Sequence, residues 1–154
     1  MSRNKNTFIG EYAYSIDAKG RINIPAKFRQ VLSEDNEKTF VITRGLDPCV
    51  WLYPQVEWDK IEAELRGLSS LSALHRTVVR NAVRYAFSTQ YDKQGRIQIT
   101  PSLIDYSHLD KSILILGMVN KIEVWNPDIL DNVDKQSRAI DPVKYEELAE
   151  KIKL

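Results

Sequence analysis

One short sequence pattern occurs twice in this chain of 154 residues. The first copy is Ile16–Pro25, with the sequence IDAKGRINIP, and the second is Tyr91–Pro101, with the sequence YDKQGRIQITP. In both copies an aspartate precedes a Gly-Arg pair, and two isoleucines then alternate with polar residues. A single pattern of this kind is weak, but two copies at one constant offset predict that the chain contains two versions of one structural unit.

Each copy is predicted to fold as a tight turn followed by a short strand. Asp17 can accept hydrogen bonds from the backbone N–H groups just after it, and Gly20 can adopt the positive φ of a hairpin loop. Ile22 and Ile24 alternate with polar residues, which is the period of a strand with one buried face. Lysine and arginine side chains are left at the tip and exit of each turn, where they reach solvent.

The sequence around the two turns repeats as well. Tyr53-Pro54 and Asn126-Pro127 each precede a predicted helix, and a strand at 84–90 is expected before the second turn. The predicted organisation is a first unit at 8–54, a helical connector at 55–83, a second unit at 84–127 and a helical tail at 128–154. Units of about 45 residues bury too little surface to be stable alone, so we expect the two halves to interlock around one core.

The helical segments are less constrained by the sequence. In the connector, Ser69 or Ser70 is expected to cap the second of two helices. Arg76, Arg80 and Arg84 recur on that helix at a spacing that places them on one face. This arginine ladder could bind phosphates, pair with acidic residues of an adjacent subunit or simply face solvent. The segment 141–154 is either an amphipathic helix or a frayed tail.

Composition restricts the classes of function. The formal net charge is +1, so any binding to nucleic acid must come from charge concentrated on one face or from many copies in an oligomer. Cys49 is the only cysteine, which suits a reducing cytoplasm. Residues 1–7 lack the apolar core of a signal peptide, and the longest apolar run, 113–119, is too short to span a bilayer. We expect a cytoplasmic protein that does not enter a membrane.

Catalysis and cofactor binding are not expected. His75 and His108 are isolated, and no Cys-x-x-Cys, His-x-x-x-His or glycine-rich phosphate loop occurs. Cys49 follows Pro48 in a strand-like run, which is typical of a buried structural thiol. We therefore predict that the protein is not an enzyme and has no metal, cofactor or small-molecule substrate.

Positive charge is concentrated near the first turn. Residues 1–30 contain six Lys or Arg against two Asp or Glu. Basic side chains at a turn can neutralise phosphates, and arginine can also address guanine O6 and N7 in the major groove. The aspartate of each turn could hold its arginine in a fixed pose through a charge-assisted hydrogen bond. The alternative is a capped turn with a surface ion pair of little energetic consequence, and the duplication favours the DNA-binding interpretation.

The two turns and their flanks resemble those of the MraZ family. The resemblance is carried by FIGEY at 8–12, DAKGRINIPAKFR at 17–29, DKQGRI at 92–97 and NKIEVW at 120–125. It implies an α+β protein in which two tandem SpoVT/AbrB-like units form one double-psi β-barrel-like, swapped-hairpin fold. It also implies a bacterial, nucleoid-associated transcriptional regulator of the division and cell-wall gene cluster. Such a protein would bind short direct repeats of double-stranded DNA in its own promoter as a ring-shaped homo-oligomer.

The resemblance further implies that the Asp-x-x-x-Arg turns contact DNA. With their basic neighbours, the candidate DNA-binding residues are Asp17, Lys19, Arg21, Lys27, Arg29, Asp92, Lys93 and Arg96. The second copy has Thr100 where the first has Pro25, and Ser102 to Ile104 lack the charges of Lys27 and Arg29. The second turn is therefore expected to bind DNA less strongly than the first.

Two other interpretations remain, and one further segment is a candidate. The turns could instead mediate contacts with other subunits or with antitoxin-like partners, in a protein-binding assembly module that does not bind DNA. RNA binding is less favoured, because the turns lack the aromatic platforms on which RNA-binding modules stack bases. Arg3, Asn4 and Lys5 form an N-terminal arm that is a further candidate for contact with the minor groove.

Overall fold

The computed structural model describes residues 5–154, which form a mixed α and β fold. The strands are β1 (Phe8–Ser15), β2 (Arg21–Asn23), β3 (Thr39–Arg44), β4 (Val50–Pro54), β5 (Phe87–Gln90), β6 (Arg96–Gln98), β7 (Ser112–Val119) and β8 (Ile122–Trp125). An antiparallel six-stranded sheet has the order β1-β7-β8-β4-β3-β5, and β2 and β6 pair separately as a two-stranded ribbon. We call this pair the β2–β6 ribbon.

The two halves of the chain exchange strands within the large sheet. β1 of the first half pairs with β7 of the second half, and β5 of the second half pairs with β3 of the first. β4 and β8 join the halves at the centre of the sheet, where Val50 lies opposite Val124. Neither half has a complete sheet without the other, which confirms the expectation that the two halves interlock.

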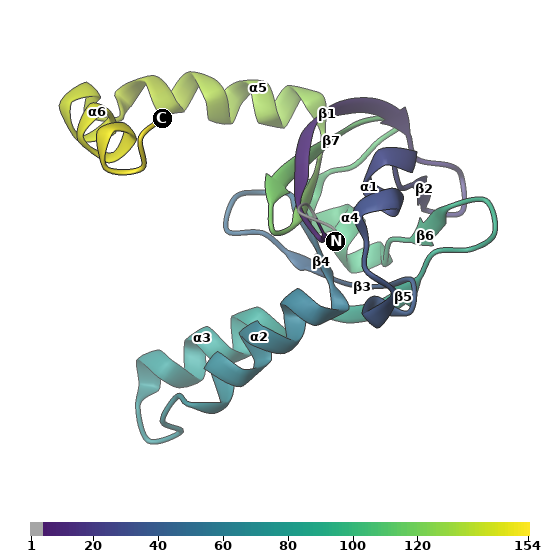
Figure 1. Ribbon diagram of the computed structural model, residues 1–154, viewed down its shortest axis with the longest axis horizontal. Helices are drawn as coiled ribbons and strands as arrows, with labels where there is room; N and C mark the ends of the chain where they lie inside the picture. Colours follow the sequence, from purple (N-terminus) through teal and green to yellow (C-terminus); the bar gives the residue numbers. More distant parts are fainter. Residues whose placement is uncertain (1–4) are drawn as a thin grey trace.

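The helices divide into two that cover the strands and two pairs that project from them. The helices are α1 (Ala26–Val31), α2 (Gln55–Arg66), α3 (Ala73–Val83), α4 (Pro101–Ser107), α5 (Pro127–Gln136) and α6 (Pro142–Lys151), with 3-10 turns at Glu34–Asn36 and Ser137–Ala139. In Figure 1, α1 and α4 lie against the strands, whereas the α2–α3 pair and the α5–α6 pair extend away from them. The segment after 141 is therefore mainly helical rather than a frayed tail.

The core explains which face of the β2–β6 ribbon is exposed. Ile22 and Ile97 lie directly opposite each other in the ribbon, and each side chain is only 1% exposed. They pack in one apolar cluster with Phe28 of α1 and Leu103 of α4, which hold equivalent places in the two halves. Because side chains alternate along a strand, burying the isoleucines directs their polar neighbours to solvent.

A buried carboxylate links the two central strands. Glu123 on β8 accepts hydrogen bonds from the indole N–H groups of Trp51 and Trp125, both at 2.8 Å, and from the thiol of Cys49 at 3.7 Å. Burial, reinforced by the nearby carboxylate of Glu123, raises the pKa of Cys49 far above its usual range. Cys49 is therefore a protonated, buried thiol, as the sequence predicts.

Two local predictions were wrong. Ser72 rather than Ser69 or Ser70 caps α3, and its hydroxyl accepts from the N–H of His75 at 3.2 Å. The helix begins later than expected because Ser69 is held in the preceding loop, where its N–H donates to the His75 ring at 2.9 Å. The strand before the second turn begins at Phe87 rather than at 84, because the helical hydrogen bonds of α3 continue to the N–H of Arg84.

Candidate nucleic-acid interface

The first predicted turn is closed by its aspartate. Oδ1 of Asp17 accepts hydrogen bonds from the backbone N–H groups of Lys19 at 2.9 Å and Arg21 at 2.8 Å. The backbone carbonyl of Asp17 accepts from Gly20 at 3.0 Å, and Gly20 has a φ of 78°. The turn thus depends on an aspartate that satisfies backbone donors and on a glycine that accepts a positive φ without steric strain.

The second turn repeats this geometry. Oδ1 of Asp92 accepts from the N–H groups of Gln94 and Arg96, both at 2.9 Å. Gly95 donates to the carbonyl of Asp92 at 2.9 Å and has the same φ of 78°. The two copies of the sequence pattern therefore form two copies of one turn, as predicted.

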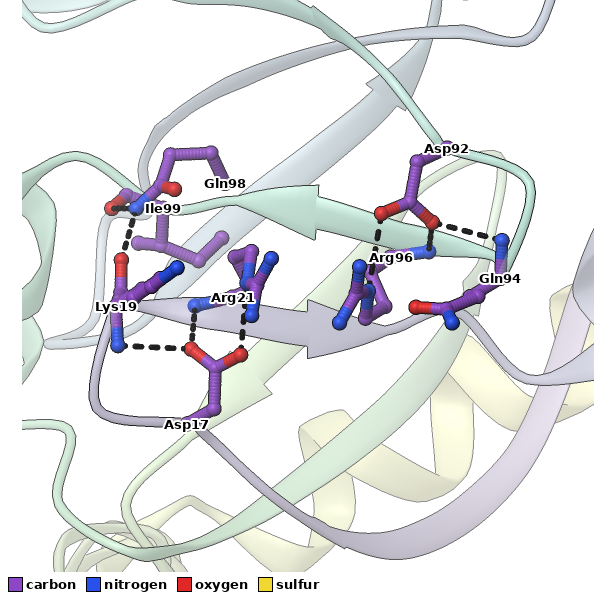
Figure 2. Close-up of polar contacts among 8 residues, drawn as sticks. All are labelled: Asp17, Lys19, Arg21, Asp92, Gln94, Arg96, Gln98 and Ile99. Atoms are coloured by element: carbon purple, nitrogen blue, oxygen red, sulfur yellow. Dashed lines mark hydrogen bonds and ion pairs between the residues drawn. The ribbon is translucent and has the colours of Figure 1, made fainter.

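Each aspartate uses its second oxygen to hold the arginine of the same turn. Oδ2 of Asp17 lies 2.8 Å from Nε of Arg21, and Oδ2 of Asp92 lies 2.9 Å from Nε of Arg96 (Figure 2). Because the contact is made at Nε, the two terminal NH₂ groups of each guanidinium take no part in this hydrogen bond and keep donors for another partner. We call these two contacts the Asp–Arg braces.

The braces are ionised at neutral pH. The pKa of Asp17 is lowered from its ordinary value of 3.8, chiefly by the hydrogen bond from the backbone N–H of Arg21 and further by the guanidinium of that residue. The pKa of Asp92 is lowered in the same way by Arg96. Both carboxylates are exposed, so the significance of the braces lies in the position of the arginines rather than in the stability of the fold.

The register of the β2–β6 ribbon brings the two arginines together. Arg21 lies opposite Gln98, and Asn23 lies opposite Arg96, with the buried Ile22–Ile97 pair between them. These four polar residues share the outer face of the ribbon, with the arginines at diagonally opposite corners. Figure 2 shows Arg21 and Arg96 on this one face, flanked by the two aspartates. We call the face formed by Arg21, Asn23, Arg96 and Gln98 the ribbon face.

The two turns lie at opposite ends of the ribbon, because β2 and β6 are antiparallel. The N–H of Ile24, just after β2, donates to the carbonyl of Gly95 at 2.8 Å. Symmetrically, the N–H of Ile99 donates to the carbonyl of Gly20 at 2.8 Å. Each strand therefore runs from its own turn to the turn of the other half, and Lys19 and Lys93 are exposed at the two tips.

Arg29 lies against the second turn, although its position in the sequence suggested the first. Its Nε donates to the carbonyl of Ile24 at 3.1 Å, and a Cβ on Gly95 would come within 2.7 Å of that nitrogen. The equivalent place above Gly20 is taken by Ile104, whose Cδ1 would lie 3.1 Å from such a Cβ. The second turn therefore does not lack the charge of Arg29, because the exchange of strands between the halves places that side chain beside it.

The remaining candidates are not part of the ribbon face. Lys27 is exposed on α1 and lines a hollow beside β1 with Thr7, Ile9 and Tyr12. In the predicted arm, Lys5 is exposed, whereas residues 3 and 4 lie outside the described part of the chain. The arginine ladder on α3 belongs to the helix pair that projects away from the β2–β6 ribbon (Figure 1).

Asn23 and Gln98 were not among the residues singled out in the sequence. Both are exposed on the ribbon face. The signal that could have identified them is their alternation with Ile22 and Ile97, which places each on the same side of its strand as the arginine two positions away.

Other kinds of site are not evident in residues 5–154. In this range no group of three or more His, Cys, Asp or Glu side chains is arranged to hold a metal ion. None of the helices described is both long and apolar enough to cross a lipid bilayer.

Comparison with known proteins agrees with the duplication. The model of the family described as "MraZ protein, putative antitoxin-like" matches twice in tandem, at residues 7–81 and 82–151. The chain belongs to the MraZ family. It is 46% identical over 119 residues to the transcriptional regulator MraZ of Halothermothrix orenii, an alignment that covers 77% of this chain and 80% of that protein. It is also 38% identical over 145 residues to the transcriptional regulator MraZ of Carboxydothermus hydrogenoformans, covering 94% and 96% of the two chains.

Proposed function

We propose that this protein is a DNA-binding transcriptional regulator and that the ribbon face is its DNA-binding surface. The observation that carries the proposal is the pair of braced arginines, Arg21 and Arg96, on one face of a two-stranded ribbon. The major groove of DNA admits a two-stranded ribbon, and an arginine with a free guanidinium end can bind guanine O6 and N7 together. The regulators from Halothermothrix orenii and Carboxydothermus hydrogenoformans support the same role by their names.

Lys19, Lys93 and Arg29 fit the role of phosphate contacts at the ends of the ribbon. The two lysines are exposed at the tips, and Arg29 supports the second turn. Asp17 and Asp92 act by positioning the arginines rather than by touching DNA. Lys27 remains a candidate for a contact outside the groove, next to β1.

We infer that the target is a set of short direct repeats in the protein's own promoter, within the division and cell-wall gene cluster. The protein would bind these repeats as a homo-oligomeric ring, in the cytoplasm and at the nucleoid. The net charge of only +1 gives modest attraction to DNA per copy, and joining several copies raises avidity by about 10² to 10⁴ without new contacts. Exposed apolar side chains on the projecting helices, such as Leu74 on α3 and Leu148 on α6, offer surfaces for such assembly.

The finer description of the fold belongs to the same proposal. The exchange of β1 and β5 between the halves supports a double-psi β-barrel-like, swapped-hairpin fold of two SpoVT/AbrB-like units. The division of the chain at 8–54, 55–83, 84–127 and 128–154 stays a prediction.

The direct test is fluorescence anisotropy with a labelled duplex from the region upstream of the gene. Replacing Arg21 or Arg96 with alanine should weaken specific binding by about 1–3 kcal/mol, because a base contact is lost. Arg66→Ala is a matched control, since Arg66 is exposed on α2 and its ion pair among residues 5–154 is with Glu62 of the same helix. Wild-type binding should also weaken with salt, at a log–log slope of about −0.9 per phosphate neutralised.

The same measurements distinguish a DNA-binding regulator from a protein-binding assembly module. An assembly module without DNA binding would leave the upstream duplex unbound, and the Arg21→Ala variant would change the number of subunits instead. Equal losses for the Arg21→Ala and Arg66→Ala variants would show that charge in general, rather than the ribbon face, determines binding.

A further inference from the structure

Asn23 is the one amide on the ribbon face whose polar atoms are both available. It is exposed on β2, directly opposite Arg96, and its side chain takes part in none of the hydrogen bonds found among residues 5–154. Ile22 on one side of it and Ile24 on the other are each 1% exposed. The backbone at Asn23 is thus fixed by the core, while its side chain faces outward beside an arginine held by Asp92.

Gln98 occupies the equivalent corner of the ribbon face but is already engaged. Its Nε2 donates to the carbonyl of Lys19 at 2.5 Å and to the carbonyl of Ile99 at 3.2 Å. Of the two ends of the Gln98 amide, only the nitrogen can donate to two carbonyl oxygens, so these partners fix the orientation of the amide. Gln98 therefore joins its own strand to the turn of the other half, and within the described part of the chain only its amide oxygen has no hydrogen-bond partner.

This difference has a chemical consequence for base recognition. An amide side chain recognises adenine in the major groove by accepting from N6 and donating to N7 at the same time. Asn23 can do both. Gln98 cannot without giving up its contact with Lys19, because both of its N–H donors are used.

We propose that Asn23 reads an adenine in the major groove, next to the base contacted by Arg96. The proposal rests on the proposed function and adds a specificity-determining residue to it. Arg96 and Asn23 then recognise two bases at one end of the ribbon, whereas Arg21 recognises one base at the other end. Although the two turns have the same structure, the base contacts differ at the two ends of the ribbon, so the recognised DNA sequence is asymmetric.

The spacing along β2 separates the base that Asn23 would contact from the base that Arg21 would contact. Residues two apart on a strand, such as Arg21 and Asn23, are separated by about 6.6 Å at a rise of about 3.3 Å per residue. Successive bases are about 3.4 Å apart along a DNA strand. Two side chains on β2 would therefore address positions about two base steps apart, without distortion of the ribbon.

The test is a base-pair scan of the upstream duplex by fluorescence anisotropy, with the full-length wild type and its Asn23→Ala variant. Changing the adenine that Asn23 reads should weaken wild-type binding by about 5- to 150-fold. The Asn23→Ala variant should bind the original and the changed duplex equally at that position, and should keep its discrimination elsewhere. Replacing that adenine with 7-deazaadenine, which lacks the N7 acceptor, should weaken binding by the wild type but not by the variant.

Gln98→Ala is the matched control at the other corner. It should weaken binding to all duplexes by a similar factor, because it loosens the turn at Lys19 without removing a base contact. An Asn23→Ala variant with the same base preferences as the wild type, or with a uniform loss across all duplexes, would overturn the assignment while leaving the proposed function standing. A wild type without any sequence preference would overturn both.

Discussion

Asp17 and Asp92 each use one carboxylate oxygen to close the turn and the other to hold the arginine. Asparagine can keep the first contact, because its amide oxygen accepts from backbone N–H groups. It loses the second, because an amide NH₂ cannot accept from the Nε of arginine. Asp17→Asn should therefore weaken DNA binding, because Arg21 is no longer held in place, and should leave the melting temperature nearly unchanged, because the lost ion pair is exposed. Anisotropy and thermal unfolding of the same samples measure both effects.

The matched control for this prediction is Asp59→Asn. Asp59 is a carboxylate on α2 whose Oδ1 accepts from Gln55 at 2.8 Å in an exposed contact. It shares the charge change but lies outside the ribbon face. Because both substitutions remove a negative charge, any effect of net charge alone should be shared and should strengthen binding to DNA. A similar loss of affinity in both variants would mean that the loss does not arise from the position of Arg21.

The lowered pKa of both aspartates gives the braces a definite pH range. A carboxyl group whose pKa is lower in the folded state stabilises that state above its unfolded pKa, and this contribution is lost as the pH falls through the folded pKa. We expect both braces to be intact at pH 5–8 and to open only below 3.8, the ordinary value of the carboxyl pKa. Carboxyl carbon NMR shifts of Asp17 and Asp92 should titrate with midpoints below 3.8. Midpoints at or above that value would show that the braces are not formed in solution.

At the scale of the elements, the second turn combines a left-handed backbone conformation, which favours glycine, with close packing. Gly95 has a φ of 78° and is covered by Arg29. Gly95→Ala should reduce the free energy of unfolding by at least about 1–2 kcal/mol, the cost of a left-handed conformation for a residue with a Cβ. It should also weaken DNA binding, because the guanidinium of Arg29 must move. Urea denaturation and anisotropy measure these two effects.

Gly67 at the end of α2 provides the control for this substitution. Its φ is −77°, and a Cβ there would meet only a backbone carbonyl at 3.4 Å. Gly67→Ala should therefore be neutral or stabilise the fold by about 0.4–1 kcal/mol, since alanine restricts the unfolded chain. If the two variants lost stability equally, the left-handed φ of Gly95 would not explain its effect.

The sequence predicted the two turns, whose contacts are local, and missed features that depend on the partner half or on competition between neighbouring residues. Asp17 and Gly20 determine their turn through contacts within a few residues, so the turn could be identified from its own residues. The place of Arg29 could not, because it depends on which turn α1 covers after the strands are exchanged. Ser72 was missed because several serines compete as caps, and the winner is decided by the loop contact of His75.

At the scale of the whole molecule, strand exchange completes the ribbon face within one chain. β2 and β6 come from different halves, and each braced arginine is held by an aspartate of its own half. Oligomerisation is therefore not required to build the face. In the proposed ring, oligomerisation would repeat the face along DNA and so raise the overall affinity above that of one copy.

This geometry makes the spacing of the DNA repeats a sharp test. Faces held in a ring can engage together only when successive repeats present the same side of the duplex, which recurs about every 10–10.5 base pairs. A duplex with several repeats should bind about 10² to 10⁴ more tightly than a duplex with one. Inserting about five base pairs between repeats rotates the next one by half a turn, and should remove most of that gain without changing the affinity for a single repeat. Fluorescence anisotropy measures the affinity for the duplex with one repeat, the duplex with several repeats and the duplex with the half-turn insertion. Light scattering measures the number of subunits in the same samples. A gain that survives the half-turn insertion would mean that the copies bind independently rather than as one rigid assembly.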